Sequence, residues 1–342
     1  MAYDLYNDDD NANLIVLGIG ESGCKAIEYL REQRYFDEYR EVRYSTVFSH
    51  ADLLPKANTD QLTQIDTHIP ALFDSKANAE SINGYLHQCI GDVFKAVDAL
   101  FILTDFRDSE NIKRVSAVSR MLAKKEITNA RFIVAIISQP ALYEGKLLQQ
   151  QFNQGKQELL KYCDTVIVNS TDMIHRKLKE NDGQLTDYVT QAFEANYQSL
   201  QVFIRTIAMQ GLICVDFADV YAVVADMNEA IVVSAKGEGD DRANQAVNVA
   251  LKNIEQEWGV LFNPEIGAVL VDICAADMAL EELDVIASII YQAFLGTVRI
   301  KIGTAMDEKM NDQLEVTILV VKRKLEIHEV LPAIEKDKTV SL

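Results

Sequence analysis

Apolar residues in the first half of the chain gather in short runs separated by longer amphipathic stretches. The runs predict buried strands at Leu14–Leu17, Tyr44–Phe48, Ala99–Thr104, Phe132–Ile137 and Thr165–Val168. The stretches between them predict helices, among them Lys25–Glu32, Asn111–Lys125 and Gly145–Tyr162. Short apolar strands that alternate with helices are typical of a parallel sheet with βαβ crossovers. The first half is therefore expected to be a doubly wound α/β domain.

One longer amphipathic segment follows, from about Leu185 to Gln210. Its apolar residues recur at steps of three and four without an internal glycine or proline, and Gly211 supplies a stop signal. At 1.5 Å per residue the predicted helix is on the order of 35–40 Å long, which is enough to connect two domains.

Beyond this helix strands and helices alternate again. Strands are predicted at Ala230–Ser234, Ala268–Ala275, Thr297–Ile302 and Leu314–Val321, and helices at Arg242–Trp258 and Leu280–Phe294. The pattern predicts an α/β fold in five parts: an acidic tail at 1–13, a doubly wound domain at 14–184, a central helix at 185–210, a smaller second α/β domain at 211–325 and a short tail at 326–342.

The charge of the chain narrows the choice of partners. It carries 33 Lys and Arg residues against 52 Asp and Glu residues, a formal net charge of −19. Such a surface repels phosphate groups, so neither nucleic acid nor direct membrane binding is expected. No apolar run approaches the roughly 18 residues of a membrane span, and the N-terminus lacks the apolar core of a signal peptide, so a cytoplasmic location is expected. The 5 cysteines and 5 histidines are scattered, which predicts free thiols and no metal site.

A glycine motif follows the first predicted strand. Gly18, Gly20 and Gly23 match the G-x-G-x-x-G dinucleotide fingerprint in the required strand–turn–helix context. Such glycines let the backbone approach a phosphate, and the helix N-terminus adds a positive dipole. The fingerprint also requires an acidic residue about twenty positions further on, where this chain has Phe48-Ser49-His50. A dinucleotide-binding module therefore remains a distant alternative.

The segment GLICVDFADV at residues 211–220 is more specific. It closely resembles GLMNVDFADV, the loop after the central helix of FtsZ, the bacterial relative of tubulin. The resemblance continues at GEGDDRA (237–243), GAVLVDI (267–273) and IGTAMDEKMNDQL (302–314), and the order of elements agrees over roughly residues 12–325. The chain is thus similar to FtsZ, which implies the FtsZ and tubulin fold: a nucleotide-type domain, a central helix and a smaller α/β domain.

The resemblance also implies roles for two carboxylates. FtsZ binds GTP and polymerises head to tail, and the loop after its central helix places two carboxylates at the neighbouring subunit's nucleotide, where they position water. Asp216 and Asp219 match this catalytic pair, although Cys214 replaces the asparagine of the family. The alternative is that the D-x-x-D pair only caps the helix that follows.

The expected phosphate loop departs from the family. Where FtsZ has G-G-G-T-G-T-G, this chain has RDSENIK at residues 107–113. Side chains with a Cβ restrict the backbone conformations that close around phosphate, and Asp105, Asp108 and Glu110 would face it with the same charge. The remaining positions that match the family's cofactor-binding residues are Gly18, Gly20, Gly23, Glu144, Asp172 and Phe193, and Phe193 fits plain helix core better.

The sequence therefore predicts an FtsZ-like cytoskeletal or cell-division protein that is deficient in GTP binding and hydrolysis. It is expected to form filaments with copies of itself or to modulate filaments of an FtsZ, without a bound cofactor. The alternative is a self-polymerising GTPase with a remodelled phosphate loop, which would hold GTP or GDP with Mg²⁺. Arg107 or Lys113 would then bind phosphate.

Overall fold

The structure, a computed structural model, describes residues 12–34, 42–47, 97–107, 109–123, 128–180, 188–208, 211–259, 265–294 and 298–324. The short tail at 326–342 and nearly all of the acidic tail at 1–13 lie outside these residues. Asp108 of the expected phosphate loop lies outside them as well.

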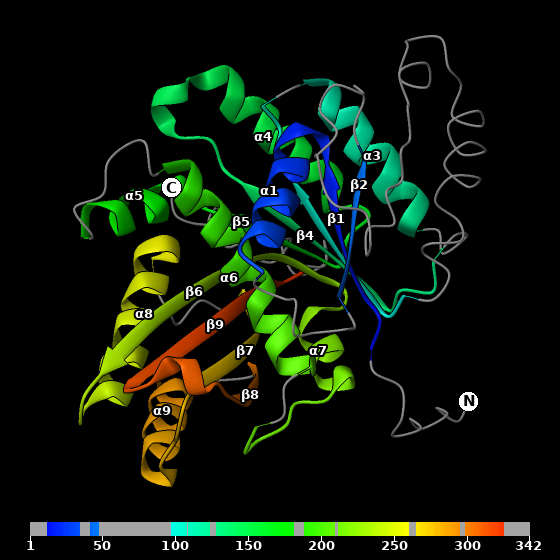
Figure 1. The fold of residues 1–342 in the computed structure, drawn as a ribbon. Helices are drawn as coiled ribbons and strands as arrows, with labels where there is room; N and C mark the ends of the chain where they lie inside the picture. Colours follow the sequence, from blue (N-terminus) through cyan, green and yellow to red (C-terminus); the bar gives the residue numbers. More distant parts are fainter. Residues whose placement is uncertain are drawn as a thin grey trace, which may run out of the picture.

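The strands of this part of the chain form one nine-stranded sheet in the order β2-β1-β3-β4-β5-β6-β9-β7-β8 (Figure 1). Their bounds are β1 (Leu14–Ile19), β2 (Val42–Val47), β3 (Ala99–Thr104), β4 (Phe132–Ser138), β5 (Thr165–Asn169), β6 (Met227–Glu238), β7 (Ile266–Ala275), β8 (Arg299–Met306) and β9 (Gln313–Arg323). Strands β1 to β6 pair in parallel, β9 runs antiparallel to β6 and β7, and β8 is parallel to β7. The predicted α/β class is confirmed.

Helices cover the sheet in two groups, α1, α3 and α4 beside β1–β5, and α8 and α9 beside β6–β9 (Figure 1). The helix bounds are α1 (Gly20–Glu32), α3 (Ser109–Ala123), α4 (Lys146–Leu159), α5 (Thr171–Glu180), α6 (Tyr188–Ala208), α7 (Phe217–Val224), α8 (Arg242–Trp258) and α9 (Leu280–Ala293), with single 3-10 turns η2 (Leu142–Glu144) and η4 (Glu308–Met310). Alternate residues of β1 enter different cores: Leu14 and Val16 pack with α1 and α6, and Ile15 packs with α3 and α4. This two-sided burial explains why the strands appear as continuous apolar runs.

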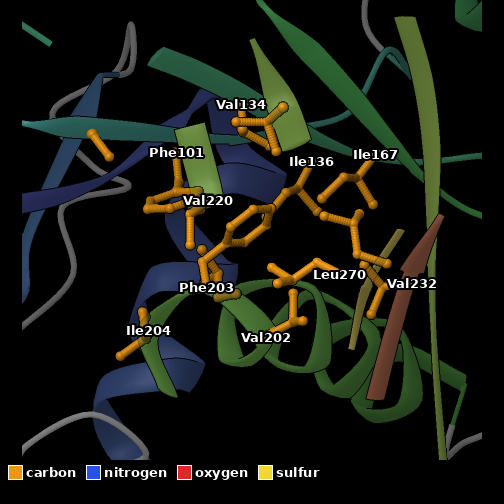
Figure 2. Packing of buried hydrophobic residues seen from close by; sticks show 14 of the residues in the cluster. Phe101, Val134, Ile136, Ile167, Val202, Phe203, Ile204, Val220, Val232 and Leu270 are labelled. Atoms are coloured by element: carbon orange, nitrogen blue, oxygen red, sulfur yellow. The ribbon is translucent and has the colours of Figure 1, made fainter. Parts of the chain in front are cut away.

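Helix α6 lies in the middle of the largest core. Phe203 packs on Phe101 of β3 with ring centroids 5.1 Å apart. The same cluster contains Val232 of β6 and Leu270 of β7 (Figure 2). One continuous apolar cluster thus joins both expected halves of the chain through this helix, so α6 is fixed to both.

Several element boundaries differ from the sequence-based prediction. Helix α1 begins at Gly20 rather than near Lys25, because Gly20 adopts a φ of +76° and turns the chain directly from strand to helix. The strands of the second half continue the sheet of the first, since β5 and β6 pair at two positions. Helix α5, of 10 residues, was not predicted because its periodic window is short. Helix α7, of 8 residues, was expected only as the helix that the D-x-x-D pair would cap.

Three further expectations can be compared with the structure. No helix in the described ranges is long and apolar enough to cross a membrane. Among the same residues no group of His, Cys, Asp and Glu could hold a metal ion. Four of the cysteines, Cys24, Cys163, Cys214 and Cys274, are free thiols, as predicted.

Candidate functional site

The order of the strands indicates where a ligand would bind. The chain passes from β1 to β2 on one side and to β3 on the other, so the carboxyl ends of β1 and β3 form a topological switch point. In open α/β sheets, ligands bind in the crevice at such a point. Two segments meet there, the turn from β1 into α1 and the loop from β3 into α3.

The three glycines of the fingerprint sit in the first of these turns and allow close packing. A Cβ on Gly23 would lie 2.3 Å from the carbonyl oxygen of Leu103, and one on Gly18 would lie 2.5 Å from the carbonyl oxygen of Gly23. A Cβ on Gly20 would lie 2.5 Å from the Asn111 side chain. The predicted strand–turn–helix context is present. Close packing is by itself a sufficient reason for a glycine at each of the three positions, with or without a bound phosphate.

Asn111 joins the two segments. Its side chain is buried and its Nδ2 donates to Thr104 Oγ1 at 3.0 Å and to the carbonyl oxygen of Asp105 at 2.7 Å. Its Oδ1 has no hydrogen-bond partner among the described residues and lies directly against Gly20. A side chain therefore fills the space between the N-termini of α1 and α3, where a glycine would leave room.

Asp105 places a carboxylate at the same point. Its carboxylate lies near Ser22 in the first turn of α1 and near the backbone of Arg107, and its Oδ2 lies 3.4 Å from Arg107 Nε. Burial raises the pKa of this carboxyl above its ordinary value, while Arg107 and Ser22 oppose the shift. A carboxylate of the protein itself thus lies beside the helix N-terminus, the kind of position that binds phosphate in other proteins.

Arg107 continues the group towards η2. Its guanidinium forms a two-nitrogen ion pair with Glu144, with Nη2 3.3 Å from Oε2. Glu144 Oε2 also accepts from the backbone N–H of Ala141 at 2.6 Å. Asp105, Arg107 and Glu144 therefore satisfy one another, and we refer to these three residues as the internal ion group.

Two other predicted cofactor-binding residues lie outside the internal ion group. Asp172 is exposed in the first turn of α5. Phe193 is half-buried on α6 and packs against Tyr29 of α1, with ring centroids 5.3 Å apart. The core interpretation of Phe193 is therefore the one that the contacts support.

Asp216 and Asp219 lie at the opposite end of α6. The helix begins at Tyr188, whose environment includes Arg107 and Glu144, and its 21 residues extend for about 30 Å before the loop that carries the two aspartates. One molecule cannot bring both ends together, so a shared site would need a second subunit.

Each of these aspartates already has a partner within the subunit. Asp216 is the N-cap of α7, and its carboxylate accepts from the backbone N–H of Asp219 at 2.7 Å. Asp219 forms an ion pair with Lys301 of β8, and its side chain is 34 % exposed. The helix-capping interpretation of Asp216 is thus correct as geometry, whether or not the residue also acts on a neighbour.

Both ends of the molecule expose large apolar side chains. Beside the internal ion group, Leu142 is 77 % and Tyr143 is 69 % exposed. In the loop before α7, Leu212 is 63 % exposed. Surfaces of this kind often mark interaction sites when they are contiguous.

Sequence reasoning missed three contributors to these sites. Ser22 had no signal of its own, and Asn111 had none beyond its departure from the glycine-rich pattern of the family. Lys301 had none at all, because it is separated from Asp219 by more than 80 residues and pairs with it only through the fold.

Comparisons with known proteins concern the fold and the sequence as a whole. The FtsZ family C-terminal domain model matches residues 228–323. The cell division protein FtsZ of Buchnera aphidicola subsp. Baizongia pistaciae is 27% identical over 321 residues, covering 91% of this chain and 79% of that protein. An empty FtsZ dimer from M. jannaschii superposes with a TM-score of 0.76 at 20% identity, over 94% of this chain and 95% of that one. The GTPγS-bound protofilament of CetZ2 from Haloferax volcanii gives 0.64 at 14% identity, over 96% and 100%. The chain therefore has the fold that FtsZ and CetZ share.

Proposed function

We propose that this FtsZ-like chain of the tubulin and FtsZ superfamily is a cytoskeletal or cell-division protein that assembles without GTP. The single observation that carries the proposal is the internal ion group, which places the Asp105 carboxylate beside the first turn of α1. The protein either forms filaments of its own or modulates filaments of a true FtsZ.

The residues at the switch point do not fit a triphosphate. A phosphate there would lie beside the Asp105 carboxylate, which already interacts with Ser22 and with the backbone of Arg107. It would also need the space that the Asn111 side chain fills beside Gly20. Like charges 4 Å apart repel by on the order of 4 kcal/mol at an effective dielectric constant of 20. Lys113, which is exposed, does not remove either obstacle.

The opposite end supports the same proposal. A carboxylate that positions water at a neighbour's nucleotide acts best when its charge is not already engaged within its own subunit. Asp216 stabilises α7 as its N-cap, and Asp219 is neutralised by Lys301. The charged residues at both ends thus have partners within the subunit. This favours a stabilising role for them over a role in GTP hydrolysis.

The contact between subunits then depends on protein groups alone. The exposed Leu142 and Tyr143 at one end and Leu212 at the other supply apolar area, and Arg107, 45 % exposed, faces acidic residues of the far end across such a contact. Charged pairs of this kind steer and orient association more than they strengthen it.

Assembly is therefore expected to be independent of GTP and to weaken with salt. In sedimentation and negative-stain electron microscopy, the pelleted fraction should be the same with and without GTP and Mg²⁺. It should fall as the salt concentration rises from about 0.05 to 0.5 M, because the Debye length shrinks from more than 10 Å to about 4 Å. Filaments that form only after GTP is added would contradict the proposal.

Modulation of a true FtsZ gives a second expected result. The 211–220 end resembles FtsZ, so it can dock onto the GTP-bearing end of an FtsZ filament, while the altered switch point disfavours the next addition. Protein added well below one to one is expected to lower FtsZ sedimentation and GTP turnover.

The variant that tests this docking keeps α7 intact. Asp216→Ser with Asp219→Asn removes both charges, and serine remains a good N-cap, whereas alanine at 216 would cost about 1 kcal/mol of helix stability. The double variant is expected to lose most of the effect on FtsZ while it melts within a few degrees of wild type. An equal effect of both proteins, or none of either, would show that the loop serves only the fold or assembly with copies of the same chain.

A further inference from the structure

Three charged side chains meet in the interior between α6 and the sheet. Arg205 of α6 lies 2.8 Å from Glu315 of β9 and 3.4 Å from Asp272 of β7, measured from its Nη1 to Glu315 Oε2 and Asp272 Oδ2. Arg205 is 7%, Asp272 1% and Glu315 5% exposed. These three residues are called the buried charge cluster below.

The two carboxylates of the cluster are not equally satisfied. Glu315 also accepts from the Ser234 hydroxyl at 2.9 Å, and Ser234 in turn accepts from Thr317. Asp272 has only the long contact of its Oδ2 with Arg205, and its Oδ1 has no hydrogen-bond partner among the described residues. Asp272 is therefore the carboxylate of the cluster with the fewest hydrogen-bond partners.

The guanidinium of Arg205 also has a partner on α6 itself. With its amide oxygen facing them, Gln201 accepts from the Tyr197 hydroxyl at 2.7 Å and from Arg205 Nε at 2.9 Å. The guanidinium is thus shared among Gln201, Glu315 and Asp272. With both carboxylates ionised, the cluster holds a buried net charge of −1, which is costly in a low-dielectric interior.

Charged and titratable groups from four elements surround the buried charge cluster. Helix α6 contributes Arg205 and Tyr197, β9 contributes Glu315, β6 contributes Lys236 near Glu315, and β7 contributes Cys274. Burial raises the pKa of the Cys274 thiol to about 12, so it stays neutral. Burial also raises the pKa of Glu315, but Arg205, Lys236 and Ser234 outweigh it, and the pKa of that carboxyl lies below its ordinary value.

Asp272 is the group in this set that changes its charge near neutrality. Burial raises the pKa of its carboxyl to about 7, the Glu315 carboxylate adds to the shift, and Arg205 opposes it. We propose that Asp272 is a proton switch, and that protonation of its side chain tightens the contact of α6 with β7 and β9. Because α6 also packs on the first half of the sheet, the switch sets how firmly the two halves are joined.

The sign of the effect follows from proton linkage. Above a pKa of 3.8, the value for an unperturbed carboxyl, Asp272 is ionised in the unfolded chain but protonated in the folded one up to about 7. Its contribution to stability is complete below 3.8 and is lost as the pH rises through about 7. Glu315 acts in the opposite direction, and only below its ordinary pKa of 4.5, so it does not interfere at higher pH.

The test compares melting temperatures from pH 5.5 to 8.5 for wild type, Asp272→Asn and Asp284→Asn. The last is the matched control, because Asp284 is an exposed aspartate on α9. Between pH 6 and 8 wild type and the control are expected to lose about 2–3 °C more than Asp272→Asn, which lacks the titrating group. Parallel profiles of wild type and Asp272→Asn would overturn the proposal.

A second variant and a local measurement separate a proton switch from a merely structural residue. In Glu315→Gln the repelling carboxylate is gone, so the pH-dependent loss is expected at lower pH, whereas an unchanged midpoint would refute the assignment to Asp272. In hydrogen exchange on wild type, corrected for the intrinsic rate, peptides from α6 and β7 should be less protected at pH 8 than at pH 6. Equal protection at both values would also overturn the proposal.

Discussion

Arg205→Met is expected to destabilise the fold by about 3–5 kcal/mol at pH 8. The substitution keeps most of the side-chain volume but leaves Asp272 and Glu315 buried without a cation. At pH 5.5 the loss should be smaller, because the carboxylates can then take up protons. Urea unfolding at both pH values measures the difference, and a change below about 1 kcal/mol at pH 8 would show that the arginine does not compensate the two carboxylates.

The control for this prediction removes the charges together. The triple variant Arg205→Met, Asp272→Asn, Glu315→Gln has no buried ion left, so it should recover most of the stability that the single variant loses. A triple variant as unstable as Arg205→Met would mean that the loss arises from the packing of methionine on α6 rather than from unpaired charge.

The strands of the first half could be predicted because the sheet is buried on both faces. Strand β3, flanked by helices on either side, appears in the sequence as the uninterrupted apolar run Ala99–Thr104, and its bounds were predicted correctly. Helix α7 was expected only from the D-x-x-D cap, since it owes its start to Asp216 and its burial to the core around α6 rather than to its own periodicity. Sequence periodicity therefore predicts elements that are determined by their own residues, and not those that depend on a cap or on tertiary packing.

The candidate site was predictable only in part, because some of its contacts join residues that are far apart in the sequence. The glycine turn and the loss of glycines at 107–113 are local features, and both could be recognised in the sequence. The ion pairs of Arg107 with Glu144 and of Asp219 with Lys301 join residues that are distant in the chain. Neither pair has a local signal in the sequence, because only the fold brings its two residues together.

The other large effect concerns nucleotide binding. Each 1.4 kcal/mol is tenfold in Kd, so one like-charge contact of about 4 kcal/mol weakens a micromolar site to about millimolar. Asp105 supplies such a contact, and the Asn111 side chain removes space in addition. GTP is therefore expected to bind at least about a thousandfold more weakly than to a site without these two obstacles. Without bound nucleotide, no GTP hydrolysis is expected at any protein concentration.

Isothermal titration calorimetry of the purified protein with GTP, with and without Mg²⁺, tests the central claim most directly. An FtsZ that binds GTP serves as the positive control under the same conditions, and the nucleotide content of the purified protein is measured by chromatography. The account predicts no binding heat at micromolar concentrations and no co-purifying guanine nucleotide. Micromolar binding, or guanine nucleotide retained through purification, would contradict it and would favour the GTPase with a remodelled phosphate loop.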